Sequence, residues 1–178
     1  MGRRQAIKDA IREAFGDVAF PSHMGIHAAI AMDDWISDPH TLAEITKEKD
    51  IKGKWWDIPE GEFRYMSLAS CYFDAKATEF YLPAFMTAVI NDTCFAKYRC
   101  LLDWLEPGIN DEECALYDYF KEQFANISGK KRASCITVLE YIRDHIDPKD
   151  YSGEMDVNEL LSHEFWNQSA NKKLNPTV

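Results

Sequence analysis

Apolar residues recur at steps of three and four along most of the chain, which is the spacing of one face of an α-helix. In residues 3–15, for example, Ile7, Ile11 and Phe15 share a face, and Gly16 ends the pattern. Alternating apolar and polar positions, typical of a half-buried strand, are scarce. The pattern therefore predicts a mainly α fold, a multi-helix bundle with short connections and little or no sheet. The expected helices cover residues 3–15, 22–35, 39–45, 75–90, 95–104, 110–124, 133–146 and 157–166.

Capping residues indicate where several of these helices begin. Asp38 precedes Pro39, the order typical of an N-cap followed by the first helical position. Pro83, inside an apolar stretch, is expected to restart or kink its helix. The other predicted caps are Ser22, Asp74, and Asn110 with Glu113 as its capping-box partner.

The chain of 178 residues has the length of one domain. Its 46% hydrophobic and 28% charged residues are an ordinary globular mixture, which excludes a wholly disordered, collagen-like or disulfide-scaffold protein. We assign residues 1–167 to a single α-helical domain. Residues 168–178 are polar and are expected to form a flexible C-terminal tail.

The expected location of the protein is the cytoplasm. The N-terminus has no apolar run of signal-peptide length, and no window approaches the roughly 20 apolar residues that span a bilayer. The five cysteines are an odd number without a Cys-x-x-Cys pair, which favours reduced thiols. Cys71 and Cys94 lie among apolar residues and are expected to be small buried hydrophobes.

Two short motifs carry a resemblance to a known family. Trp-Asp-Ile-Pro occupies residues 56–59, and Tyr-Leu-Pro-Ala-Phe occupies residues 81–85. Over residues 5–145 the chain resembles an uncharacterised bacterial family, a domain of unknown function with the second motif in its core. The resemblance implies a shared helical core and a bacterial origin, and it transfers no catalytic residue.

One candidate for chemistry is a histidine pair. His23 and His27 are four residues apart and would share one face of a helix, where Asp33, Asp34 or His40 could complete a metal site. This arrangement would suit a metal-dependent enzyme. The glutamate of the HExxH motif is missing, because Met24, Gly25 and Ile26 separate the histidines.

A second candidate is the acidic stretch of residues 147–159, which is reminiscent of an EF-hand calcium loop. Asp150, Asp156 and Glu159 occupy ligand positions of a loop that begins at Pro148, but proline has no side-chain oxygen for the first position. The stretch is therefore a degenerate EF-hand-like candidate, and the alternative is a turn at Gly153.

No motif of nucleophilic or phosphate-transfer catalysis occurs in the sequence. Adjacent carboxylates point about 100° apart on a helix, so they do not converge on one substrate atom. We therefore expect no cofactor and favour a protein that is not an enzyme, although active sites also assemble from residues distant in sequence.

Charge is unevenly distributed along the chain. Lys and Arg number 20 against 30 Asp and Glu, and the formal net charge is −10. Residues 103–122 and 144–164 together hold 14 acids and 2 bases, so the remainder is close to neutral. This distribution disfavours nucleic acid and anionic membranes as partners.

Aromatic side chains are interleaved with the acids of both segments, a combination of electrostatic steering and apolar anchors that fits a basic protein partner. The sequence therefore suggests an acidic protein-binding module, most specifically a bacterial immunity protein that neutralises a basic toxin domain by covering its active surface. The candidate partner-binding residues are Asp111, Glu112, Glu113, Asp118, Tyr119, Glu122, Asp150, Asp156 and Glu159.

Overall fold

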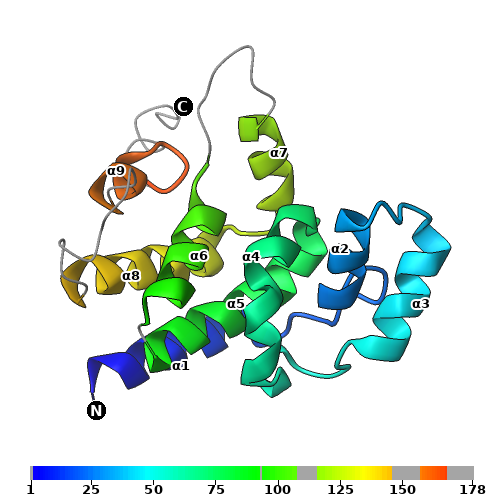
Figure 1. The fold of residues 1–178 in the computed structure, drawn as a ribbon. Helices are drawn as coiled ribbons and strands as arrows, with labels where there is room; N and C mark the ends of the chain where they lie inside the picture. The colour runs from blue at the N-terminus through cyan, green and yellow to red at the C-terminus, as the bar shows by residue number, and fades with distance from the viewer. Residues whose placement is uncertain (1, 93, 108–115, 146–156, 168–178) are drawn as a thin grey trace, which may run out of the picture.

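Helices form almost all of the regular structure, as a computed structural model shows for residues 2–92, 94–107, 116–145 and 157–167 (Figure 1). No strand occurs in these ranges, so the predicted mainly α fold is confirmed. The α-helices are α1 (Arg3–Phe15), α2 (Ile26–Asp33), α3 (Pro39–Lys49), α4 (Met66–Ala69), α5 (Ala75–Asn91), α6 (Phe95–Leu105), α7 (Leu116–Gln123), α8 (Gly129–His145) and α9 (Val157–Ser162). The 3-10 turns are η1 (Trp55–Asp57), η2 (Glu60–Tyr65) and η3 (Ser70–Tyr72).

Helix α5 is the centre of the core. Twelve of its 17 residues are buried, and it contacts α1, α6, α7 and α8. Helices α2 and α3 pack together at one side of the molecule, and α9 packs on α8 (Figure 1). The apolar stripe of α1 lies in this core, because Ile7, Ile11 and Phe15 are buried as their spacing predicts.

Helix α5 continues through Pro83, so the expected restart of the helix at this residue does not occur. Proline has no N–H to donate to the carbonyl of Glu79, four residues earlier, so one helical hydrogen bond is lost. Burial of the apolar residues on both sides of Pro83 outweighs that loss. The Thr87 hydroxyl also donates to the Pro83 carbonyl at 2.8 Å, which ties the two turns together.

Two buried tryptophans donate hydrogen bonds to carbonyls at the C-terminal ends of helices. The Trp55 indole N–H donates to the carbonyl of Phe15, the last residue of α1, at 3.0 Å. The Trp166 indole N–H donates in the same way to Leu105, the last residue of α6, at 2.9 Å. Carbonyls at a helix C-terminus lack intrahelical partners, so each indole satisfies one of them while it fills the core.

Helix α2 differs most from its predicted bounds. It begins at Ile26 after Gly25, and not at a Ser22 cap. The reason is a cap from another element, since the Asp50 carboxylate accepts from the His27 backbone N–H at 3.3 Å. The helix also ends at Asp33, so Trp35 lies outside it.

Other helix bounds also depart from the expected pattern, and α3 extends to Lys49, beyond the predicted residue 45. Helix α8 begins at Gly129, before the predicted residue 133, and α9 ends at Ser162, before the predicted 166. Residues 60–72 form η2, α4 and η3, where no helix was expected. The predicted Asn110 cap and the 168–178 tail lie outside the described residues. Among the described residues, no helix is both long and apolar enough to cross a bilayer.

Candidate functional site

A cavity of about 400 Å³ opens between η3, α6 and α7. Asp103 and Glu106 bring two carboxylates to its wall, and Leu116 and Tyr119 are large apolar side chains that remain 61% and 44% exposed beside it. The lining residues are Ser67, Ser70, Cys71, Cys100, Asp103, Trp104, Glu106, Leu116, Tyr119, Phe120 and Gln123. The cavity thus combines negative charge with exposed apolar surface.

The turn η3 is held by hydrogen bonds from both sides. The Tyr119 hydroxyl of α7 donates to the Cys71 carbonyl at 2.6 Å, and the buried Gln123 amide donates to the Ser70 carbonyl at 2.6 Å. On the other side, the Tyr72 hydroxyl donates to the Asp33 carboxylate at the end of α2 at 2.8 Å. These bonds fix α7 and the end of α2 relative to each other through η3.

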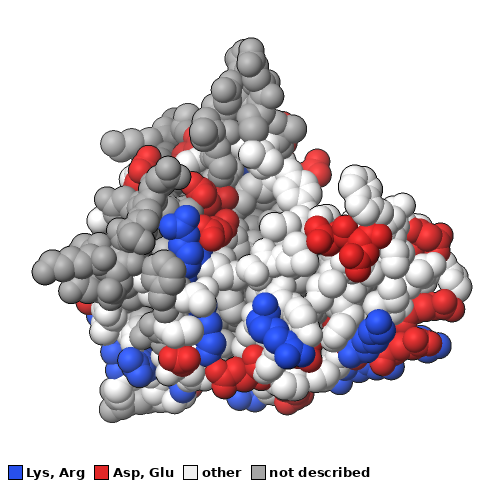
Figure 2. All heavy atoms as spheres, viewed as in Figure 1, with Lys and Arg blue, Asp and Glu red and all other residues white. Residues whose placement is uncertain are grey.

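We refer to this surface as the η3 face. It consists of Asp33, Cys71, Tyr72, Asp103, Glu106, Leu116 and Tyr119. Figure 2 shows acidic side chains gathered over the upper ends of α6 and α2, with largely uncharged surface over α4 between them. Most Lys and Arg side chains in this view lie in its lower half. A basic partner would therefore meet acids on both sides of an uncharged centre.

Negative charge at the cavity perturbs its titratable groups. Partial desolvation raises the pKa of Glu106, and repulsion from Asp103 and from Glu159 of α9 raises it further. Burial raises the pKa of the Cys100 thiol to about 12, so this cysteine stays protonated at neutral pH. A thiol that is not ionised is a poor nucleophile, and the cavity holds no activated cysteine at this position.

Trp104 leaves one buried donor in the cavity wall without a partner. Its side chain is 5% exposed, and its indole N–H has no hydrogen-bond partner among the described residues. The other buried indoles, those of Trp55 and Trp166, both donate to carbonyls. A buried donor without an acceptor costs free energy, and an acceptor from a bound partner could recover it.

The predicted binding residues are only partly brought together. Tyr119 lines the cavity, and Glu159 on α9 is close enough to raise the pKa of Glu106. Asp118 and Glu122 are exposed on α7 but are not among the residues that line the cavity. Asp118 also forms an ion pair with Lys121 at 2.6 Å. The other predicted binding residues, Asp111, Glu112, Glu113, Asp150 and Asp156, lie outside the described residues, as does most of the EF-hand-like stretch.

Sequence reasoning missed several residues of this site. Asp103 and Glu106 were counted in the first acidic segment but not assigned to binding, although that segment was the signal that could have found them. Cys71 was expected to be buried and is exposed, as is Cys94. The reason for Cys71 is its place on η3, whose backbone is held at the surface by Tyr119.

The histidine pair does not form the expected metal site. His23 precedes α2 and its Nε2 contacts the Asp74 carboxylate at 2.6 Å, whereas the His27 Nδ1 lies 3.2 Å from Asp50. The Asp33 carboxylate accepts a hydrogen bond from the Tyr72 hydroxyl. Because the two rings have different partners, they do not converge with Asp33, Asp34 or His40, and His40 lies 3.7 Å from Glu44 instead. Within the described ranges, no three His, Cys, Asp or Glu side chains are grouped to hold a metal.

Asp50 is the most deeply buried carboxylate beside these histidines, with a side chain that is 3% exposed. Its Oδ2 has no hydrogen-bond partner among the described residues, and neither has the nearby Oε2 of Glu62, which lies 3.8 Å from His27. Burial raises the pKa of Asp50 above its ordinary value of 3.8, although the bonds from His27 act in the opposite direction. Asp50 therefore holds its proton more tightly in the folded protein than in the unfolded chain.

This pKa shift predicts a pH dependence of stability that Asp50→Asn removes. The stabilisation from a raised acid pKa is fully present below pH 3.8 and is lost as the pH rises through the folded-state pKa. The difference in free energy of unfolding, wild type minus Asp50→Asn, should therefore decrease with pH across that window. Urea unfolding of both proteins from about pH 3.5 upward measures it, and a constant difference would contradict the raised pKa.

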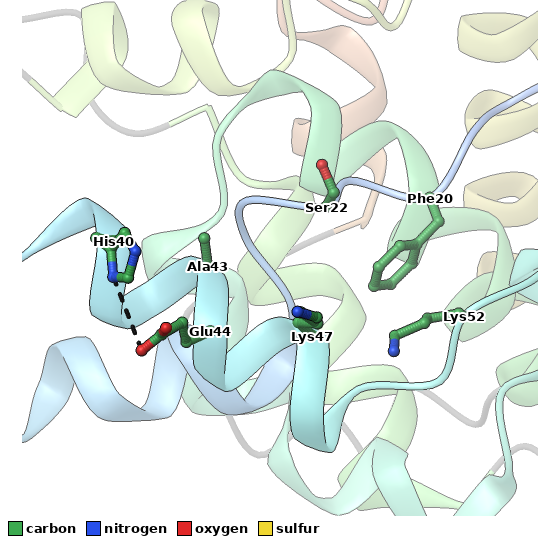
Figure 3. A pocket seen from close by; sticks show the side chains of 7 residues that line it. All are labelled: Phe20, Ser22, His40, Ala43, Glu44, Lys47 and Lys52. Carbon is green, nitrogen blue, oxygen red and sulfur yellow. Dashed lines mark ion pairs between the residues drawn. The ribbon is translucent and has the colours of Figure 1, made fainter.

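A second cavity, of about 500 Å³, has the opposite charge character (Figure 3). Lys47 and Lys52 lie near the Phe20 ring, and neither ammonium has an ion pair or hydrogen bond with a described residue. At the other end of the cavity His40 pairs with Glu44 at 3.7 Å. Because its free charges are positive, this cavity does not extend the acidic surface of the η3 face.

Comparison with known families assigns the chain at the level of a family. A model described as a family of unknown function, DUF6714, matches residues 3–170. The chain belongs to this family. Membership of DUF6714 agrees with the expected resemblance to an uncharacterised domain family, and the match spans the η3 face. No curated protein and no solved structure shows a significant match.

Proposed function

We propose that this DUF6714 chain is a protein-binding module that docks a basic partner on the η3 face. The observation that carries the proposal is the exposed pair Leu116 and Tyr119 beside a cavity whose wall holds Asp103 and Glu106. Aromatic anchors bordered by charge of one sign are typical of surfaces that capture a partner of opposite charge quickly and tightly.

The η3 face is also preorganised for binding. Tyr119 is hydrogen-bonded to the backbone of η3, so its ring is held in place before a partner arrives. An anchor that is fixed in the free protein loses less conformational entropy on binding than a free side chain. The net charge of −10 adds long-range attraction for a basic protein.

The most specific form of this proposal is a bacterial immunity protein that inhibits a basic toxin domain by covering its active surface. The concentration of acid on the η3 face supports it, because enzymes that act on nucleic acid have basic substrate-binding surfaces. Occlusion requires no catalytic group on the inhibitor, and Cys100 at the cavity is held as a neutral thiol.

The double charge reversal Asp103→Lys/Glu106→Lys, at the two carboxylates of the cavity wall, should weaken partner binding about tenfold or more at about 0.05 M salt. The loss should shrink at about 0.5 M salt, because salt screens exposed charges. The partner is first found by immobilising the wild-type protein and identifying the proteins that it retains from a lysate of the native host. The retained protein is then purified, and its affinity for the wild type and for each variant is measured by calorimetric titration.

The matched control is Asp17→Lys/Glu48→Lys, which makes the same change in net charge outside the η3 face. Equal affinities of the η3-face variant and the control would contradict docking on this face. For the inhibitor form, the activity of the purified partner is titrated with wild type and both variants, and a partner that remains active when fully bound would rule out occlusion.

A further inference from the structure

Trp35 occupies a backbone position that usually belongs to glycine. Helix α2 ends with the two hydrogen bonds of a Schellman motif, from Ile36 N–H to the Ala31 carbonyl and from Trp35 N–H to the Met32 carbonyl, both 3.0 Å long. In this motif the residue in the place of Trp35 adopts a left-handed conformation. Trp35 has φ +66°, and it is the one residue other than glycine with a positive φ in the described part of the chain.

This conformation is unfavourable for a tryptophan, and burial does not compensate for it. A Cβ in the left-handed region crowds the backbone, so bulky residues rarely occur there. The Trp35 side chain is 94% exposed and makes no hydrogen bond or ring contact with a described residue. By contrast, Trp55, Trp104 and Trp166 are each at most 5% exposed. The fold itself therefore gains nothing visible from an indole at this position.

The charged residues nearest to Trp35 in the sequence are all acidic. Asp33, Asp34 and Asp38 flank it, and no Lys or Arg occurs between residues 13 and 46. Ile36, 36% exposed, adds apolar surface next to the indole. Trp35 also lies close in the chain to the η3 face, because Asp33, the last residue of α2, accepts the hydrogen bond from Tyr72.

We infer that Trp35 is an anchor for an arginine side chain of a basic partner protein. A guanidinium stacks well on an indole through cation–π attraction, and its remaining N–H groups can donate to neighbouring carboxylates. Trp35 presents the indole and the flanking aspartates present the carboxylates. The inference rests on the proposed function for the basic nature of the partner, but it assigns a contact outside the cavity at η3.

The test uses an acetylated, amidated hexa-arginine peptide as the probe at about 0.1 M salt. Trp35→Gly should weaken its binding about fivefold, because an exposed cation–π contact is lost while every acid remains. Ile51→Gly, which removes a different exposed apolar side chain, should leave the binding unchanged. Calorimetric titration of the full-length wild type and both variants measures the affinities.

A second readout separates a binding role from a structural one. Glycine adopts a positive φ without steric cost, so Trp35→Gly should unfold at the same or a higher urea concentration than the wild type. Loss of peptide affinity with undiminished stability supports the inference. Three results overturn the inference. The Trp35→Gly variant could be less stable than the wild type, or it could bind the peptide as tightly as the wild type does. The third such result is a wild-type protein that does not bind the peptide. Failure of the proposed function is seen separately, in the partner titration of Asp103→Lys/Glu106→Lys.

Discussion

Replacing Phe85 by alanine is expected to lower the free energy of unfolding by about 4 kcal/mol, the largest effect anticipated for a single side chain here. Phe85 is 1% exposed on α5, and its ring centroid lies 5.8 Å from that of Phe63 and 6.4 Å from that of Trp104. Alanine would leave a cavity between η2, α5 and α6 that these large rings cannot fill without moving.

Urea unfolding followed by circular dichroism measures this loss, with Lys76→Ala as the control because Lys76 is an exposed residue of the same helix. Phe85→Leu should cost less, since it retains most of the apolar volume. A Phe85→Ala protein as stable as the Lys76→Ala control would show that the ring is not packed as the structure places it.

Replacing Gly25 by alanine is expected to lower the free energy of unfolding by about 3 kcal/mol through a steric clash. An added Cβ would lie 2.1 Å from Asp50 Oδ2 and 2.3 Å from its Cγ. Asp50 cannot move aside freely, because it is buried and accepts the His27 backbone N–H. The backbone of Gly25 itself suits alanine, since its φ is −116°, so the clash alone accounts for the cost.

The control for Gly25→Ala is Gly61→Ala, because a Cβ on Gly61 meets no atom within 4 Å. A double-mutant cycle identifies the cause. If the clash with Asp50 is responsible, Gly25→Ala should cost clearly less in an Asp50→Ala background than in the wild type. Equal costs in both backgrounds would point to another origin.

The helices that could be predicted are those whose signals are local. Asp38 and Asp74 cap α3 and α5 through their own backbone neighbours, with the Thr41 N–H and the Ala77 N–H as donors. The start of α2 could not be predicted, because its cap is Asp50, far along the chain. The turns around η3 were missed for a related reason: short 3-10 segments have no helical period to read.

The sequence predicts that the candidate site is acidic, but it does not predict which residues form the site. The acids and Tyr119 of α7 are visible in the sequence as an acidic segment with aromatics. Their neighbour Cys71 comes from η3, and tertiary hydrogen bonds that no spacing rule describes bring the two segments together. The sequence pattern places Trp35 at the end of the predicted helix 22–35, and only its backbone conformation reveals its position in the turn after α2.

The hydrogen bonds on both sides of η3 have a consequence for how a partner's binding energy would be distributed. The adjacent residues Cys71 and Tyr72 are hydrogen-bonded to α7 and to α2 respectively. We therefore expect η3 to transmit movement of one helix to the other. A contact made at either helix would restrain the other as well, so a second contact on the η3 face would cost less ordering than the first. Contacts at α2 and α7 would therefore reinforce each other even where they touch different parts of the partner.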